Sequence, residues 1–121
     1  LHPFTQGYFK AAIFTEHKDP RPGDINAWFD FDAAWHSVTA RDQAELIKYC
    51  DDFREANTAH LTGYPEDDAG ADFWFTRNHH GVGFWEEDHG THEQCKALTD
   101  AAHVYGEAYL ERYKGRWTYH E

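Results

Sequence analysis

The sequence predicts an α+β fold in which two hairpins form a small antiparallel sheet and about three helices pack on it. Within residues 72–86, two aromatic runs flank a tip of Asn, His and Gly, which is typical of a hairpin. A Lys-Gly pair separates two further strand-like runs near the C-terminus, and helical patterns precede and separate the two hairpins. At 121 residues we expect a single domain, residues 1–121.

The first third of the chain predicts one helix and little other regular structure. Residues 5–16 place apolar side chains at helical spacing and predict a short amphipathic helix. Residues 17–24 contain two prolines and a glycine and predict a loop. Residues 25–35 mix aromatic rings with acids without a decisive period, so we expect an irregular segment over the core.

The strongest predicted helix begins after Thr39, a good N-cap, with Asp42 in its first turn. It should run to about residue 60 or 61, where a Gly-Tyr-Pro sequence stops it. After the central hairpin, Thr91 and Gln94 match a capping box and predict a helix that Gly106 ends.

The second hairpin is predicted from residues 108–113 and 116–120, which flank Lys114-Gly115. Aromatic residues make up 17% of the chain, so we expect a core packed largely from rings. Cys50 and Cys95 fall on the apolar sides of predicted helices and should be buried free thiols, which indicates a reducing compartment.

The charge balance excludes several classes of partner. The chain has 22 acidic and 11 basic residues and a formal net charge of -11. Such a surface repels nucleic acid and anionic lipid and attracts basic proteins. No apolar run approaches the roughly 18 residues of a membrane span, and no leader pattern is visible, so we expect a cytoplasmic protein.

The run DFWFTRNHHGVGFWEE at residues 72–87, with LTDAA and VYG following at 98–102 and 104–106, resembles a widespread family of small bacteriophage and prophage proteins. Its members carry a motif like DFWLTRNGHGAGFWD, a helix like LTEAAKVYG and a closing strand segment. The similarity spans most of the chain. The family has no assigned function, so the resemblance implies phage origin and the cytoplasm of a bacterial host cell, and it implies no reaction.

Two positions depart from the family pattern. His79 stands where the family usually has glycine, which enters a left-handed turn more freely than histidine does. Either the turn shifts onto His80-Gly81, or His79 is held in that conformation. Ala71 stands where the family usually has histidine, which removes one candidate metal or catalytic ligand.

The alternative interpretation is a metal-dependent or small-molecule enzyme that uses the His-rich hairpin region. No H-E-x-x-H or C-x-x-C spacing is present, and adjacent histidines on a strand would point to opposite faces. We therefore predict no metal site and no cofactor. Acidic pairs that a hydrolase could use are expected by chance in so acidic a chain, so we predict no catalytic residues. The histidines and acidic pairs concerned are His79, His80, His89 and His92, Asp30 with Asp32, and Asp51 with Asp52.

The leading hypothesis is a phage-encoded, non-enzymatic accessory protein that binds a host protein with a basic surface. Its sharper form is an inhibitor of a bacterial defence system, of the anti-CRISPR or anti-restriction type, because those systems carry basic grooves for nucleic acid. The candidate contacts are the hairpin tip and the two acidic loops beside it, and either could make the contact. These residues are Arg77, Asn78, His79, His80, Glu66, Asp67, Asp68, Glu86, Glu87 and Asp88.

Two alternatives stay open beside this hypothesis. Arg77 could instead form a surface ion pair with Glu86, which would contribute little to stability. The chain could also be a self-associating structural protein that uses exposed rings such as Trp28 and Trp35. The oligomeric state is left open by the sequence.

Overall fold

A computed structural model describes residues 1–16 and 30–121 of the chain. The α+β class is confirmed, but within this described part the balance differs from the prediction, with five α-helices and one two-stranded antiparallel sheet. The elements are α1 (Pro3–Glu16), α3 (Phe31–Ser37), α4 (Ala40–Ala56), η1 (Thr58–Leu61), α5 (Glu66–Arg77), η2 (Phe84–Glu86), α6 (His92–Val104), β1 (Tyr109–Tyr113) and β2 (Arg116–His120).

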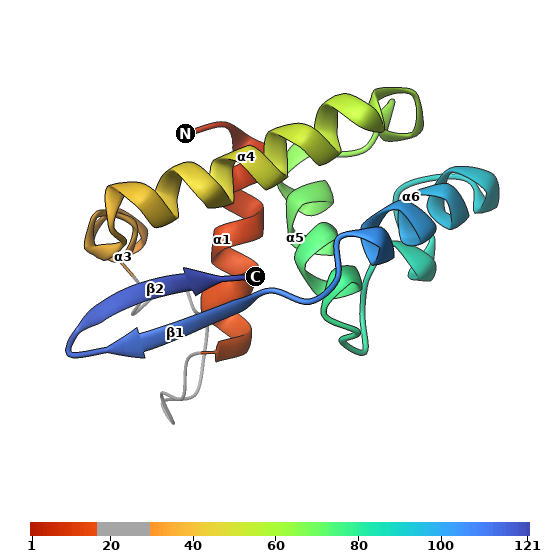
Figure 1. Ribbon diagram of the computed structural model, residues 1–121. Coiled ribbons are helices and arrows are strands. Elements are labelled where there is room, and N and C mark those ends of the chain that lie inside the picture. Colours follow the sequence, from red (N-terminus) through yellow and green to blue (C-terminus); the bar gives the residue numbers. More distant parts are fainter. Residues whose placement is uncertain (17–29) are drawn as a thin grey trace.

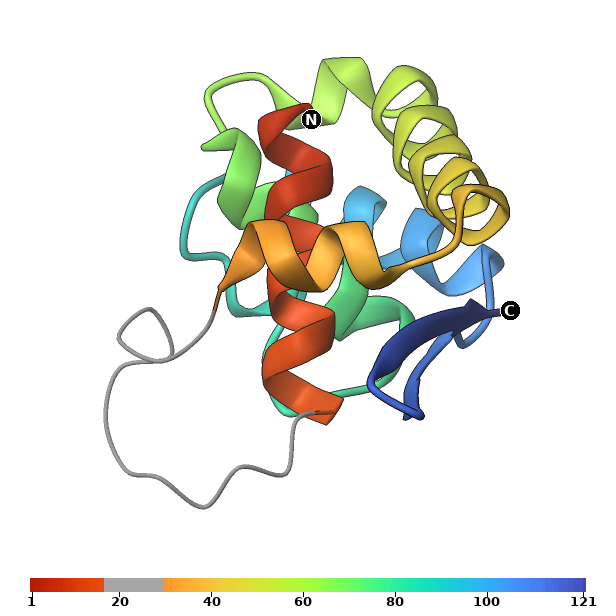
Figure 2. The ribbon, with the colours of Figure 1, turned by 90° about the vertical axis from the view of Figure 1, so that its left-hand side faces the viewer.

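Helices α1 and α5 lie side by side at the centre of the molecule (Figure 1). Helix α4 crosses them at one end, α6 packs on α5, and the β1–β2 hairpin lies beside α3 and α4 (Figures 1 and 2). Every other element therefore surrounds one pair of helices.

The central hairpin predicted for residues 72–86 is wrong. Residues 66–77 form helix α5, and the following loop leads into the short η2 helix. Phe73 and Trp74 are neighbours in sequence and both are fully buried, which a helix enclosed on two sides permits. The preference of aromatic residues for strands depends on context, and here the packing of α5 between other helices overrides it.

Two glycines let α1 and α5 touch backbone to backbone. A Cβ atom on Gly7 would lie 1.9 Å from the carbonyl oxygen of Asp67. A Cβ atom on Gly70 would lie 1.8 Å from the carbonyl oxygen of Phe4. Neither space admits a methyl group, so this close crossing requires glycine at both positions.

The core is packed largely from aromatic rings, as the composition predicts. Phe53 of α4 stacks on Phe73 of α5 with ring centroids 4.1 Å apart, and it also stacks with Phe84 at 5.9 Å. Cys50 and Cys95 are buried free thiols, as expected. Burial raises the pKa of the Cys50 thiol well above its ordinary value.

Helix α4 begins where the sequence predicts and ends sooner. The Thr39 side chain accepts a hydrogen bond from the Asp42 backbone nitrogen. The helix stops at Ala56, because the side chain of Asn57 donates to the Phe53 carbonyl oxygen at 2.9 Å and η1 follows. The predicted extension to residue 60 is therefore a separate 3-10 turn.

The predicted start of α6 and the predicted C-terminal hairpin are confirmed. The capping box of Thr91 and Gln94 opens α6, and Gly106 takes a positive φ of 70° just beyond its end. Lys114 and Gly115, with φ values of 50° and 79°, join β1 to β2 as predicted.

Part of the irregular segment predicted for residues 25–35 is the helix α3, which Asp30 caps by accepting from the Ala33 backbone nitrogen at 3.1 Å. The loop predicted for residues 17–24, and residues 25–29, lie outside the described residues.

Candidate functional site

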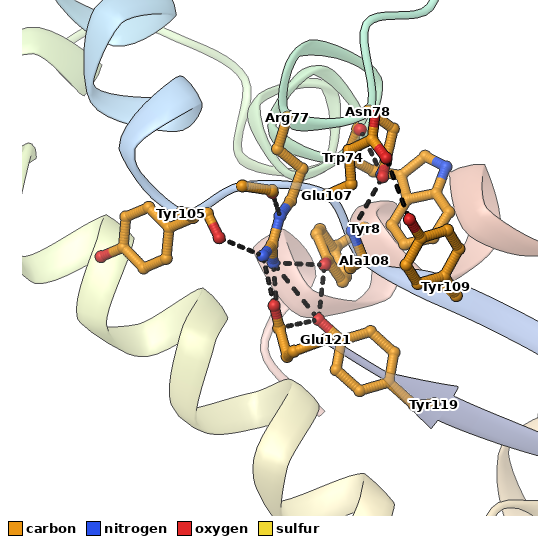
Figure 3. A network of polar contacts seen from close by, with 11 residues as sticks. Tyr8, Trp74, Arg77, Asn78, Tyr105, Glu107, Ala108, Tyr109, Tyr119 and Glu121 are labelled. Carbon is orange, nitrogen blue, oxygen red and sulfur yellow. Dashed lines mark hydrogen bonds and ion pairs between the residues drawn. The ribbon is translucent and has the colours of Figure 1, made fainter.

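Arg77 is a buried structural residue and is not part of an exposed tip. Its side chain is 0% exposed. It reaches from the end of α5 toward Glu121, which directly follows β2 (Figure 3). Its Nε donates to the carbonyl oxygen of Gly106 at 2.8 Å, and Nη2 donates to that of Tyr105 at 3.0 Å. The expected surface pair with Glu86 is wrong, because Arg77 pairs with the Glu121 carboxylate.

Two tyrosine hydroxyls complete the surroundings of the Arg77 guanidinium. Nη1 donates to the Tyr8 oxygen at 3.0 Å and to the Tyr119 oxygen at 3.3 Å, and these two oxygens are 2.8 Å apart. Burial raises the pKa of both phenols well above the ordinary tyrosine value, so both stay neutral. Burial alone would lower the pKa of Arg77, but these phenols and Glu121 outweigh it and raise that pKa. Arg77 therefore holds α1, α5 and the C-terminal hairpin together, and its buried side chain is not accessible to a partner protein.

The other residues predicted for the tip lie at the C-terminal end of α5. Asn78 donates to the Trp74 carbonyl oxygen at 2.9 Å and accepts from the Ala108 backbone nitrogen at 2.9 Å, so it has a structural role. His79 is exposed, has a φ of 55°, and stacks on His103 at 4.8 Å between ring centroids. The turn thus stays on His79 itself. His80 is half-buried, with its ring 5.8 Å from that of Phe75.

The two predicted acidic segments, residues 66–68 and 86–88, lie near each other, although the hairpin predicted between them does not form. One segment is the first turn of α5, where carboxylates stabilise the positive helix end. The other begins with Glu86, the last residue of η2, and ends with Asp88. The imidazole of His89 joins them, because its Nε2 lies 3.5 Å from Asp68 and its ring lies 5.1 Å from that of Tyr64. We call this surface the acidic face; its members are Glu66, Asp67, Asp68, Glu86, Glu87 and Asp88.

Only histidines pair with the acidic face within the described part of the chain. His2 lies 3.8 Å from Glu66, and His92 lies 3.0 Å from Glu87, besides the contact of His89 with Asp68. No lysine or arginine side chain of the described residues pairs with these carboxylates.

Asp72 lies in the same region, and the sequence reasoning missed it. The Tyr64 hydroxyl donates a hydrogen bond to its carboxylate. Burial raises the pKa of Asp72 to about 6, although Tyr64 and His89 act in the opposite direction, and Asp68 adds to the rise. Asp68 and Asp72 are four residues apart and share one face of a helix, a relation that becomes visible only when residues 66–77 are recognised as helical.

The structure does not assemble the histidine cluster of the enzymatic alternative. Among residues 1–16 and 30–121, no group of three or more His, Cys, Asp or Glu side chains is placed to hold a metal ion. Of the carboxylates considered for hydrolysis, Asp51 pairs with Arg54 at 2.8 Å and Asp52 pairs with Lys48 at 3.7 Å. Asp30 caps α3.

Of the two rings considered for self-association, Trp28 lies outside the described residues. Trp35 is half-buried against Phe9, with ring centroids 5.1 Å apart. No helix of the described residues is both long enough and apolar enough to cross a membrane. Comparison of the chain with protein-family models, with curated proteins and with solved structures found no match.

Proposed function

We propose that this chain is a phage-encoded, non-enzymatic accessory protein that binds a basic surface of a host protein through the acidic face. The observation that supports this proposal is the convergence of residues 66–68 and 86–88, two segments separated in sequence, on one side of α5. The resemblance of residues 72–87 to phage proteins supports the origin. In its sharper form, the target is a nucleic-acid-binding component of a bacterial defence system, whose basic groove the acidic face would occupy.

Electrostatics gives this proposal a measurable consequence. A net charge of -11 on a small domain steers a basic partner toward it over several ångströms. Salt shortens that range, because the Debye length falls from about 10 Å at 0.1 M to about 3 Å at 1 M ionic strength. Binding through the acidic face should therefore weaken as salt increases, chiefly through a slower association rate.

The test is affinity capture from a bacterial lysate with the full chain at about 0.05 M and about 0.5 M salt. A first variant neutralises part of the acidic face, Glu66→Gln, Glu87→Gln and Asp88→Asn together. A matched control variant neutralises three exposed acids elsewhere, Asp52→Asn, Glu55→Gln and Asp100→Asn. The two variants have the same net charge, so a difference between them reports position.

We expect the wild type and the control to capture the same basic protein at low salt, and the acidic-face variant to lose it. Equal losses in the two variants would mean that total charge decides binding, and would contradict a role of the acidic face. Recovery of no basic protein at low salt would contradict the proposed function as a whole.

A further inference from the structure

A groove of about 850 Å³ opens between α1, α3 and α5. Helix α3 crosses α1 on one side of it, as Figure 2 shows. Small residues make its floor, namely Gly7 and Ala11 of α1 and Ala71 of α5. The volume of the groove lies within the range of about 300–1,000 Å³ that is usual for ligand sites.

Aromatic rings line the groove from all three helices. Phe31 and Trp35 of α3 pack on the buried ring of Phe9, at 5.5 and 5.1 Å between centroids. Phe75 contributes from α5 and is half-buried. Phe14 contributes from α1 and is 61% exposed.

The groove is also acidic. Asp32, Asp67 and Asp68 line it, and Lys10 and His36 are the basic side chains among its lining residues. Among the described residues, no side chain pairs with the carboxylate of Asp32 or Asp67. Asp67 and Asp68 also belong to the acidic face, so the two surfaces are continuous.

We propose that this groove is the site where the basic partner inserts an arginine-bearing segment, an inference that rests on the proposed function. A guanidinium group stacks on aromatic faces and donates two parallel hydrogen bonds to a carboxylate. The groove offers both kinds of contact, because Trp35 and Phe75, as well as Asp32 and Asp67, are among its lining residues. A lysine ammonium lacks the planar fork and is more strongly hydrated, so the groove should prefer arginine to lysine.

The test uses the full chain and three probe peptides of about eight residues, which alternate leucine with arginine, lysine or glutamate. Binding is followed by two-dimensional NMR of backbone amides and of the Trp35 indole. We expect the arginine peptide to shift the Trp35 indole and the amides of Ala71 and Phe75 in a saturable way. It should bind at least about threefold more tightly than the lysine peptide, and the glutamate peptide should not bind.

Two variants test the groove directly. Asp32→Asn with Asp67→Asn should weaken binding of the arginine peptide about tenfold, since each exposed pair contributes up to about 1 kcal/mol. The matched control, Asp52→Asn with Asp100→Asn, should weaken it much less. Ala71→Leu fills the floor of the groove and should also abolish the Trp35 shift, with an unchanged circular dichroism spectrum showing that the fold is kept.

The inference is overturned if the peptide shifts residues 86–88 without shifting Trp35, or if the two double variants behave alike. The capture experiment from the lysate distinguishes a failure of the groove inference from a failure of the proposed function. Capture that survives Ala71→Leu but is lost in the acidic-face variant would retain the function and overturn the groove. Groove binding by the peptide, with capture unaffected by the acidic-face variant, would retain the groove as an arginine site and overturn the function.

Discussion

Replacing Arg77 by methionine tests whether this residue holds the fold together. Arg77→Met keeps most of the side-chain volume and removes every hydrogen bond that the guanidinium donates. The carbonyl oxygens of Tyr105 and Gly106 lose their donors, and the Glu121 carboxylate loses its cation. A surface position for Arg77, as a hairpin tip would provide, predicts almost no effect.

The magnitude follows from the burial of each group. Breaking a buried ion pair by removing one partner costs about 3–5 kcal/mol. The Glu121 side chain is 19% exposed and can turn toward water, which places the expected loss at the lower end, about 3 kcal/mol. For a domain of this length, that loss should lower the melting temperature by roughly 10 °C.

Urea unfolding followed by circular dichroism measures this loss. The control is Arg54→Met, because Arg54 pairs with Asp51 at 2.8 Å on the half-exposed side of α4 and should contribute less than about 1 kcal/mol. Glu121→Gln leaves the guanidinium and its carbonyl acceptors in place and should fall between the two. If Arg77→Met loses no more stability than Arg54→Met does, the structural role assigned to Arg77 is refuted.

Three further predictions concern the backbone and pH. Gly7→Ala and Gly70→Ala should each lower the free energy of unfolding by about 3 kcal/mol despite the helix preference of alanine, because the added Cβ would lie within 1.9 Å of a carbonyl oxygen. Their double variant should lose less than the sum, and Gly81→Ala, with open space around it, should be neutral in the same denaturation experiment. Burial raises the pKa of Asp72 to about 6, so its ionisation opposes folding. The free energy of unfolding of the wild type relative to that of Asp72→Asn should therefore fall as pH rises from about 4 to about 6.5. A difference between the two proteins that does not change with pH would contradict this. His79→Gly should stabilise the protein by about 0.5–1 kcal/mol and raise its melting temperature slightly, because a φ of 55° strains a residue with a side chain. A lower melting temperature would show that the lost stacking of His79 on His103 outweighs this strain.

Elements with local signals could be predicted from the sequence. The C-terminal hairpin depends on Lys114-Gly115, and α6 depends on a capping box that residues 91–94 contain in full. Residues 72–86 could not be assigned in this way, because a run of aromatic residues has the same composition in a strand and in a helix buried on two sides. The contact that decides for the helix joins Gly70 to Phe4, far away in the sequence.

The candidate site was predictable in composition but not in arrangement. The members of the acidic face were identified as two short acidic runs beside the predicted hairpin, whereas their convergence depends on the way residues 84–89 fold back on α5. The role of Arg77 has no local signal, since its partners Tyr8, Tyr119 and Glu121 are 69, 42 and 44 residues away. Such a residue has the same local sequence context whether it is buried or exposed.

The backbone contact between α1 and α5 also determines which parts of the molecule can move independently. Separating these helices would open the interior at Gly7 and Gly70 together, so we expect their amide hydrogens to exchange slowly and at similar rates, as one cooperative unit. Helix α3 has no fully buried residue, so its amide hydrogens should exchange much faster. The walls of the groove that α1 and α5 form would then stay fixed, while α3 adjusts its position to a bound segment.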